Sequence, residues 1–153
     1  MAEQLYSAEK AISARTREQH YNEKVRQLIQ FAYANAPAVR DRLDRAGVKP
    51  AQIRTTRDLE LIPFTTRDEI VELQRAYPPF GGLLTTAVSS LYRLLYSPGP
   101  IYVPIGNIEY ARPVLKMLHA AGLQKGDLVI CSLPSLFIAG SVAVDAMALG
   151  HRE

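Results

Sequence analysis

The loop YSPGPIYVP, residues 96–104, contains the residues of this sequence whose types and spacing point most directly to anion binding. Ser97 carries a hydroxyl group and Gly99 offers a backbone N–H, and donors of both kinds can bind phosphate oxygens. Pro98 and Pro100 have no N–H to contribute. Two interpretations follow: a rigid turn that joins two strands, or a binding loop that keeps only part of its donors.

Other residues with potential chemistry match no known catalytic pattern. His20, His119 and His151 are far apart and fit no zinc spacing, so no metal site is predicted. The sequence contains neither G-x-S-x-G nor the glycine-rich fingerprints of P-loop and dinucleotide-binding proteins. The single cysteine, Cys131, excludes an internal disulfide and is expected to be a buried, inert thiol in a reducing cytoplasm.

Composition and charge favour a globular chain that binds no nucleic acid and crosses no membrane. Hydrophobic residues make up 48% of the 153 residues, and the formal net charge is only +3. Acidic and basic residues alternate through the first half, as on a solvated helix surface. The uncharged run between Asp127 and Asp145 is interrupted by Pro134 and Gly140, so a buried strand followed by a helix is predicted rather than a membrane span.

The elements that position the loop differ between the two parts of the chain. Residues 1–75 hold most of the charged residues and are predicted to form a helical N-terminal layer, whereas residues 76–153 are charge-poor and begin an α/β domain. Gly47 is expected to end a helix, PAVRDRLDRAG. Thr66 and Glu69 have the spacing of a capping box that starts the next one.

The second part alternates strand, helix, strand and helix. LYRLLY and IYVPI are predicted strands on either side of the proline loop, and Asn107 can cap a helix in which Pro113 either makes a kink or marks a start near Arg112. LVICSL is then predicted as a buried strand. The predicted fold class is α/β, with a helical layer followed by the first strands and helices of an incomplete, largely parallel sheet that looks cut short near residue 153.

Two stretches, AYANAPAVRDRLDRAGVKPAQIRTTRDLELIPFTTRDEI and LHAAGLQKGDLVI, closely resemble the N-terminal part of phenylacetate-CoA ligases, which are adenylate-forming acyl-CoA synthetases. The resemblance implies activation of an aryl or acyl carboxylate with ATP and Mg²⁺, followed by transfer to coenzyme A. In that family an SSGTTGKP loop holds the ATP phosphates at this position. The resemblance therefore implies that Ser97 and Gly99 are phosphate contacts, although Val103 occupies the position of the family's lysine.

The stretch SLFIAGS suggests a second site through the same resemblance. Leu136, Phe137 and Gly140 match the family's GLFTGG-like stretch near the aryl end of the acid pocket, which implies a role in binding the carboxylic acid. A ring supplies apolar contact and a glycine leaves space. The alternative is that Phe137 is an ordinary core residue of an apolar helix.

By the resemblance, the adenine, metal and catalytic-lysine regions of a ligase lie beyond residue 153, so no catalytic residue can be assigned. The chain alone is expected to lack ligase activity. The alternative is a non-catalytic binding or assembly module, because the charge-poor part presents a sheet edge and apolar surface. Its partner would be a second copy or a separately encoded remainder of the ligase.

Overall fold

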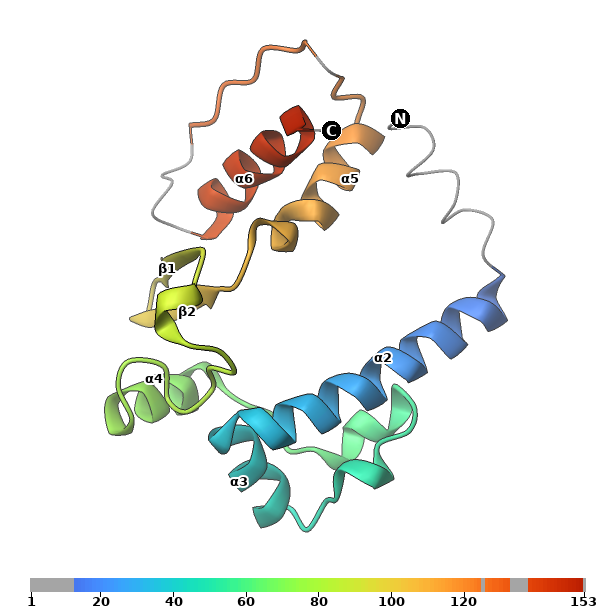
Figure 1. Cartoon of the computed structure of the whole chain (residues 1–153), viewed down its shortest axis with the longest axis vertical. Helices are drawn as coiled ribbons and strands as arrows, with labels where there is room; N and C mark the ends of the chain where they lie inside the picture. The colour runs from blue at the N-terminus through green and yellow to red at the C-terminus, as the bar shows by residue number, and fades with distance from the viewer. Residues whose placement is uncertain (1–12, 125, 133–137, 153) are drawn as a thin grey trace. The chain divides into compact units, whose positions relative to one another are not determined.

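The computed structural model describes residues 13–124, 126–132 and 138–152, and these residues divide into two compact units. The residues up to Ala87 form the N-terminal unit, and those from Val88 onward form the C-terminal unit (Figure 1). Each unit has its own hydrophobic core. No helix in the described part of the chain is both long enough and apolar enough to cross a membrane.

The N-terminal unit is helical, as its charge pattern predicted. Its elements are α2 (Ala14–Asn35), α3 (Pro37–Arg45), the 3-10 turns η1 (Pro50–Gln52) and η2 (Arg57–Leu61), and α4 (Arg67–Ala76). The Ser13 side chain accepts a hydrogen bond from the Thr16 N–H at 3.1 Å and so caps α2. Ile29 of α2 is buried with Leu43, Val48 and Ile53, which fixes α2 against α3 and η1.

The start of α4 is fixed by the predicted capping box. The Thr66 hydroxyl accepts from the Glu69 N–H at 3.2 Å, and the Glu69 carboxylate accepts from the Thr66 N–H at 2.7 Å. After α4 the chain turns back through Gly81 and Gly82, both with positive φ. The Gly82 carbonyl accepts from the Ala38 N–H at 3.1 Å, so this turn lies against the first turn of α3.

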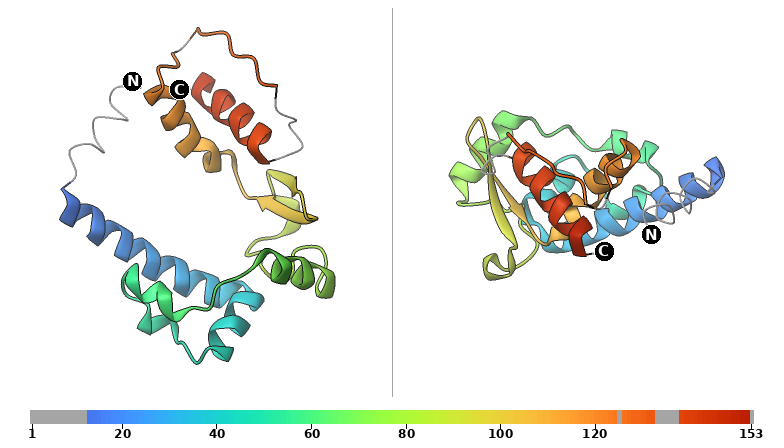
Figure 2. Two further views of the ribbon diagram at one scale, coloured as in Figure 1. Left: turned by 180° about the vertical axis from the view of Figure 1, so that it is seen from behind. Right: turned by 90° about the horizontal axis from the view of Figure 1, so that it is seen from above.

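The C-terminal unit combines one hairpin with two helices. Its elements are η3 (Val88–Ser90), β1 (Arg93–Ser97), β2 (Ile101–Ile105), η4 (Ile108–Ala111), α5 (Arg112–Ala120) and α6 (Ile138–Arg152). Helices α5 and α6 lie side by side (Figure 2). Their shared core consists of Ala111, Leu115, Ala146 and Leu149, and the Leu115 side chain lies so close to Gly150 that a Cβ there would meet it at 2.8 Å.

The mixture of helices and strands agrees with the prediction from the sequence. The predicted cap at Asn107 is also present, because the Asn107 side chain accepts a hydrogen bond from the Glu109 N–H at 2.9 Å. The α-helical part begins at Arg112, so Pro113 stands at a helix start rather than at a kink. The sheet in the described residues is antiparallel, not parallel, because three residues join its strands and a parallel pair needs a long crossover.

The described part of LVICSL departs further from its prediction as a buried strand. Residues 128–132 belong to no strand, and the side chains of Leu128 and Ile130 are 93% and 88% exposed. Cys131, expected to be buried, is partly exposed. A strand exists only when neighbouring strands bond to it, and the described residues supply none here.

Candidate functional site

The predicted loop is the turn of the β1–β2 hairpin. Ser97 ends β1 and pairs with Ile101, the first residue of β2, which leaves Pro98, Gly99 and Pro100 as the connection. Gly99 has φ +107°, a left-handed conformation that favours glycine. The structure therefore confirms a proline-rich turn between two strands, with Ser97 half-buried and Gly99 exposed.

This turn is a poor fit for an ATP triphosphate on its own residues. A phosphate cradle presents several convergent N–H groups, usually with a cationic side chain or a helix N-terminus. Of the three connecting residues, only Gly99 has an N–H, and residues 96–104 contain neither lysine nor arginine. Tyr96 and Tyr102 pair directly across the strands with ring centroids 5.8 Å apart, a feature that the sequence prediction missed.

The most developed polar cluster lies at the other end of β1. The Asp145 side chain, on α6, accepts hydrogen bonds from Arg93 Nη2 at 2.8 Å, Tyr110 Oη at 2.6 Å and Tyr92 Oη at 3.2 Å. Arg93 also donates from Nη1 to the Ser141 hydroxyl at 3.0 Å. Asp145 is 1% exposed and Ser141 is fully buried, whereas Tyr92 is 41% exposed, so the network extends from a buried carboxylate to the surface and joins β1, η4 and α6.

The electrostatics of this network favour a structural role. Burial, together with the hydrogen bond to the Asp145 carboxylate, raises the pKa of Tyr110 far above its usual range. Tyr110 therefore keeps its proton and donates a hydrogen bond to the carboxylate. The Arg93 guanidinium balances the buried charge and lies 5.4 Å from the centre of the Tyr92 ring.

The network connects the elements that carry both predicted sites. Arg93 begins the strand that ends at Ser97, and Ser141 follows Gly140 directly in the first turn of α6. Gly140 is buried, and Leu136 and Phe137 lie outside the described residues. Sequence reasoning missed Asp145, although one signal was present: it is the only Asp, Glu, Lys or Arg between residues 128 and 151.

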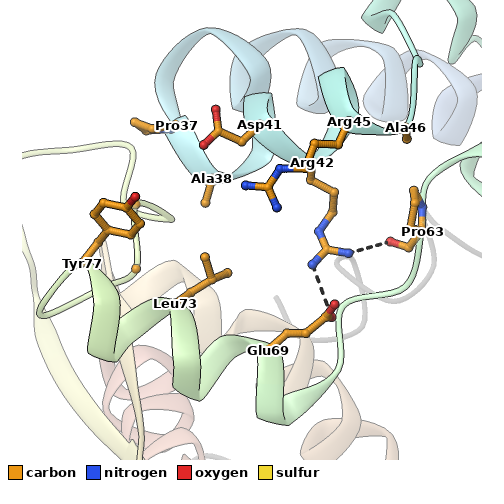
Figure 3. A pocket seen from close by; sticks show the side chains of 12 residues that line it. Pro37, Ala38, Asp41, Arg42, Arg45, Ala46, Pro63, Glu69, Leu73 and Tyr77 are labelled. Atoms are coloured by element: carbon orange, nitrogen blue, oxygen red, sulfur yellow. Dashed lines mark hydrogen bonds and ion pairs between the residues drawn. The ribbon is translucent and has the colours of Figure 1, made fainter.

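A separate cavity of about 480 Å³ lies in the N-terminal unit between α3 and α4 (Figure 3). Arg42 closes one side, because its guanidinium donates to the carbonyls of Pro63 at 3.2 Å and Phe64 at 2.7 Å and pairs with Glu69 at 3.3 Å. The backbone N–H of Thr66, aided by the charge of Arg42, lowers the pKa of Glu69. The cavity has the size of a small-molecule pocket.

Acidic, histidine and cysteine side chains do not gather into a metal centre in the part of the chain that the structure describes. There, no group of three or more such residues could hold a metal ion.

Comparisons with known proteins show which class of protein the chain is similar to. No family model matches it. Phenylacetate-coenzyme A ligase of Pseudomonas putida is 30% identical over 118 residues, which are 72% of this chain and 26% of that protein. The Thermus thermophilus phenylacetate-coenzyme A ligase is 32% identical over 114 residues, 70% of this chain and 24% of that protein. The chain thus spans about a quarter of the length of these relatives.

Solved structures agree with these relatives. The crystal structure of 2-hydroxyisobutyryl-CoA ligase in the postadenylation state with 2-HIB-AMP matches 90% of this chain with a TM-score of 0.83 and 25% identity, over 30% of that chain. An open conformation of the same ligase, in complex with 2-HIB-AMP and CoA, matches 90% of this chain and 31% of that one, again with a TM-score of 0.83 and 25% identity.

The fold and these matches define the class: the chain has the fold of the N-terminal part of an adenylate-forming acyl-CoA ligase. Within that class, about 70% of its sequence is related to phenylacetate-coenzyme A ligase. The resemblance inferred from the sequence motifs is confirmed.

Proposed function

We propose that this chain supplies the N-terminal part of an AMP-forming ligase that joins an aryl or acyl carboxylate to coenzyme A, and that it has no ligase activity by itself. The match of 90% of the chain to 30% of a 2-hydroxyisobutyryl-CoA ligase carries the proposal. That ligase binds an acyl-adenylate and CoA in its solved complex, which supports ATP and CoA as family-level cosubstrates. We also propose that the ligase uses Mg²⁺ together with ATP, and that the chain is located in the cytoplasm.

The donor chemistry of the loop supports the expected inactivity. Adenylation needs preorganised donors around the α-phosphate as negative charge builds up there. Ser97 and Gly99 are proposed as residual phosphate contacts, but Pro98 and Pro100 supply no N–H. We propose that the carboxylic acid binds at the start of α6, next to Gly140 and the neighbouring residues Leu136 and Phe137.

Pyrophosphate release tests the proposal directly. The purified chain, given ATP, Mg²⁺, phenylacetate and coenzyme A, should release no more pyrophosphate than a blank without phenylacetate. The Pseudomonas putida phenylacetate-coenzyme A ligase serves as the positive control under the same conditions. Release that depends on both ATP and phenylacetate would refute the inactivity of the chain.

A non-catalytic assembly module is a second candidate, favoured by apolar side chains that the C-terminal unit leaves in solvent. Leu94 and Met117 are 50% and 61% exposed, besides Leu128 and Ile130. Such a module would pair with a second copy or with a separately encoded remainder of a ligase. Size-exclusion chromatography with light scattering tests the first version, because a monomer at high concentration contradicts self-pairing.

A further inference from the structure

The segment 127–132, DLVICS, is the most exposed apolar stretch among the described residues of the C-terminal unit. The side chains of Leu128, Val129 and Ile130 are 93%, 43% and 88% exposed. Successive side chains of an extended segment point to opposite sides, so this segment has apolar residues on both of its faces. Strands that are apolar on both faces are typical of the interior of parallel sheets with cover on each side.

Two other elements of the same unit are only partly covered. Helix α6 packs Ala146 and Leu149 against α5, while Val144 on its other side is 37% exposed. Asp145 is the only acidic or basic residue among 138–150, and a helix that is apolar all round is normally buried. The β1–β2 hairpin is a two-stranded sheet, and such sheets are marginal without further strands or a covering helix.

We propose that the 127–132 segment is an interaction surface that becomes a β-strand between strands from the rest of an acyl-CoA ligase large domain. This inference rests on the proposed function. The solved ligases support the occupant, because 90% of this chain accounts for only 30% of a whole ligase with the same fold. The part of that ligase beyond the matched region is the proposed source of the neighbouring strands.

A second copy of the chain is a poorer occupant. Two copies that pair these segments around a two-fold axis give each segment one neighbouring strand and leave its other edge open. A segment with two apolar faces is buried fully only with neighbouring strands on both sides and a layer above and below. Strands from a ligase large domain can supply all of these.

Co-expression tests the pairing. The chain is produced together with a tagged remainder of the Thermus thermophilus phenylacetate-coenzyme A ligase, which begins after the region that matches this chain. We expect the chain to co-purify with the tagged remainder. Hydrogen exchange of the amides of residues 128–131 should slow by at least about tenfold in the complex relative to the isolated chain, because pairing protects them.

Single substitutions locate the surface. Leu128→Asp and Ile130→Asp should each lower the amount of co-purified chain by about tenfold, since a charge replaces an apolar contact. Both side chains are exposed, so circular dichroism of the isolated variants should match the wild type. Leu28→Asp, which changes a 62% exposed side chain on α2 of the N-terminal unit, is the matched control and should co-purify as the wild type does.

Several results would overturn the inference. Unchanged exchange in the complex, or full retention of both Asp variants, means that the remainder binds elsewhere. Absence of a complex also rejects it, as does a homodimer that Leu128→Asp abolishes, which would make a second copy the occupant. None of these results depends on pyrophosphate release by the isolated chain, so the proposed function and this inference can fail separately.

Discussion

The Asp145 carboxylate shows how one residue can organise a unit without reacting. Its hydrogen-bond donors Tyr92, Arg93 and Tyr110 are 53, 52 and 35 residues away in sequence. The sequence marks Asp145 as an isolated charge in an apolar stretch, but it does not reveal the donors. Local periodicity carries no information on such distant pairs, because they depend on how β1, η4 and α6 pack.

Replacement of Asp145 by alanine should be strongly destabilising. It leaves the Arg93 guanidinium without its carboxylate partner, and because the Arg93 side chain is 32% exposed, water compensates in part. We expect the free energy of unfolding in urea to fall by about 2–4 kcal/mol. Glu72→Ala, which breaks an ion pair with both side chains 67% exposed, is the control and should have almost no effect. Equal losses would contradict a structural role for Asp145.

Tyr110 should make the fold sensitive to alkali. Burial and the bond to Asp145 raise its pKa in the folded state above the ordinary 10.0. Its stabilising contribution is therefore complete below pH 10 and declines as the pH rises above that value, because only the unfolded chain then releases the proton readily. Urea unfolding at increasing alkaline pH should show this decline, and Tyr110→Phe should make it shallower. An unchanged slope in the variant would show that the Tyr110 hydroxyl is not the cause of the decline.

At the scale of elements, short-range signals predicted more than long-range ones. The capping box at Thr66, the Asn107 cap and the helix end near Gly47 all act within a few residues, and the structure confirms each. The 127–132 segment has strand composition but no strand, because a strand requires partners that composition cannot provide. The direction of the β1–β2 pair follows from the length of its connection, which the sequence does contain.

Two glycines offer a matched test of the turn after α4. Gly47 and Gly81 have φ +67° and +65°, but a Cβ at Gly47 meets nothing within 4 Å, whereas one at Gly81 lies 2.9 Å from the Leu73 backbone carbon. Gly47→Ala should cost about 1 kcal/mol through backbone strain alone. Gly81→Ala should cost about 3 kcal/mol, because α4 must also shift. Similar losses in urea unfolding would show that the turn adapts freely.

At the scale of the whole molecule, the class of protein could be predicted from the sequence, but whether the loop at residues 96–104 binds a phosphate could not. Two long motifs sufficed to indicate the ligase class, and the comparisons confirm it. The division of the chain near residue 75 and the roles of Ser97, Gly99 and Gly140 stay predictions. Binding depends on how many donors converge on a ligand, and one hairpin turn contributes few.

Calorimetry with ATP tests whether the loop at residues 96–104 binds nucleotide. Titration of the purified chain with ATP in the presence of Mg²⁺ should give no binding heat above dilution, because the proposed contacts at Ser97 and Gly99 are too few to hold a triphosphate without the rest of a ligase. The Pseudomonas putida phenylacetate-coenzyme A ligase is the positive control. Saturable heat that Ser97→Ala reduces would instead support a remodelled phosphate loop.

The Asp145 network also has a consequence for the order of folding. Its bonds close loops of 35 to 53 residues, whereas the contacts of α2 with α3 join neighbours in sequence. Loop closure costs entropy before the contact is gained, so chains with distant contacts fold more slowly. After dilution from denaturant, amides of α2 and α3 should become protected before those of β1 and α6. The C-terminal unit would then stay open for longer in a newly made chain.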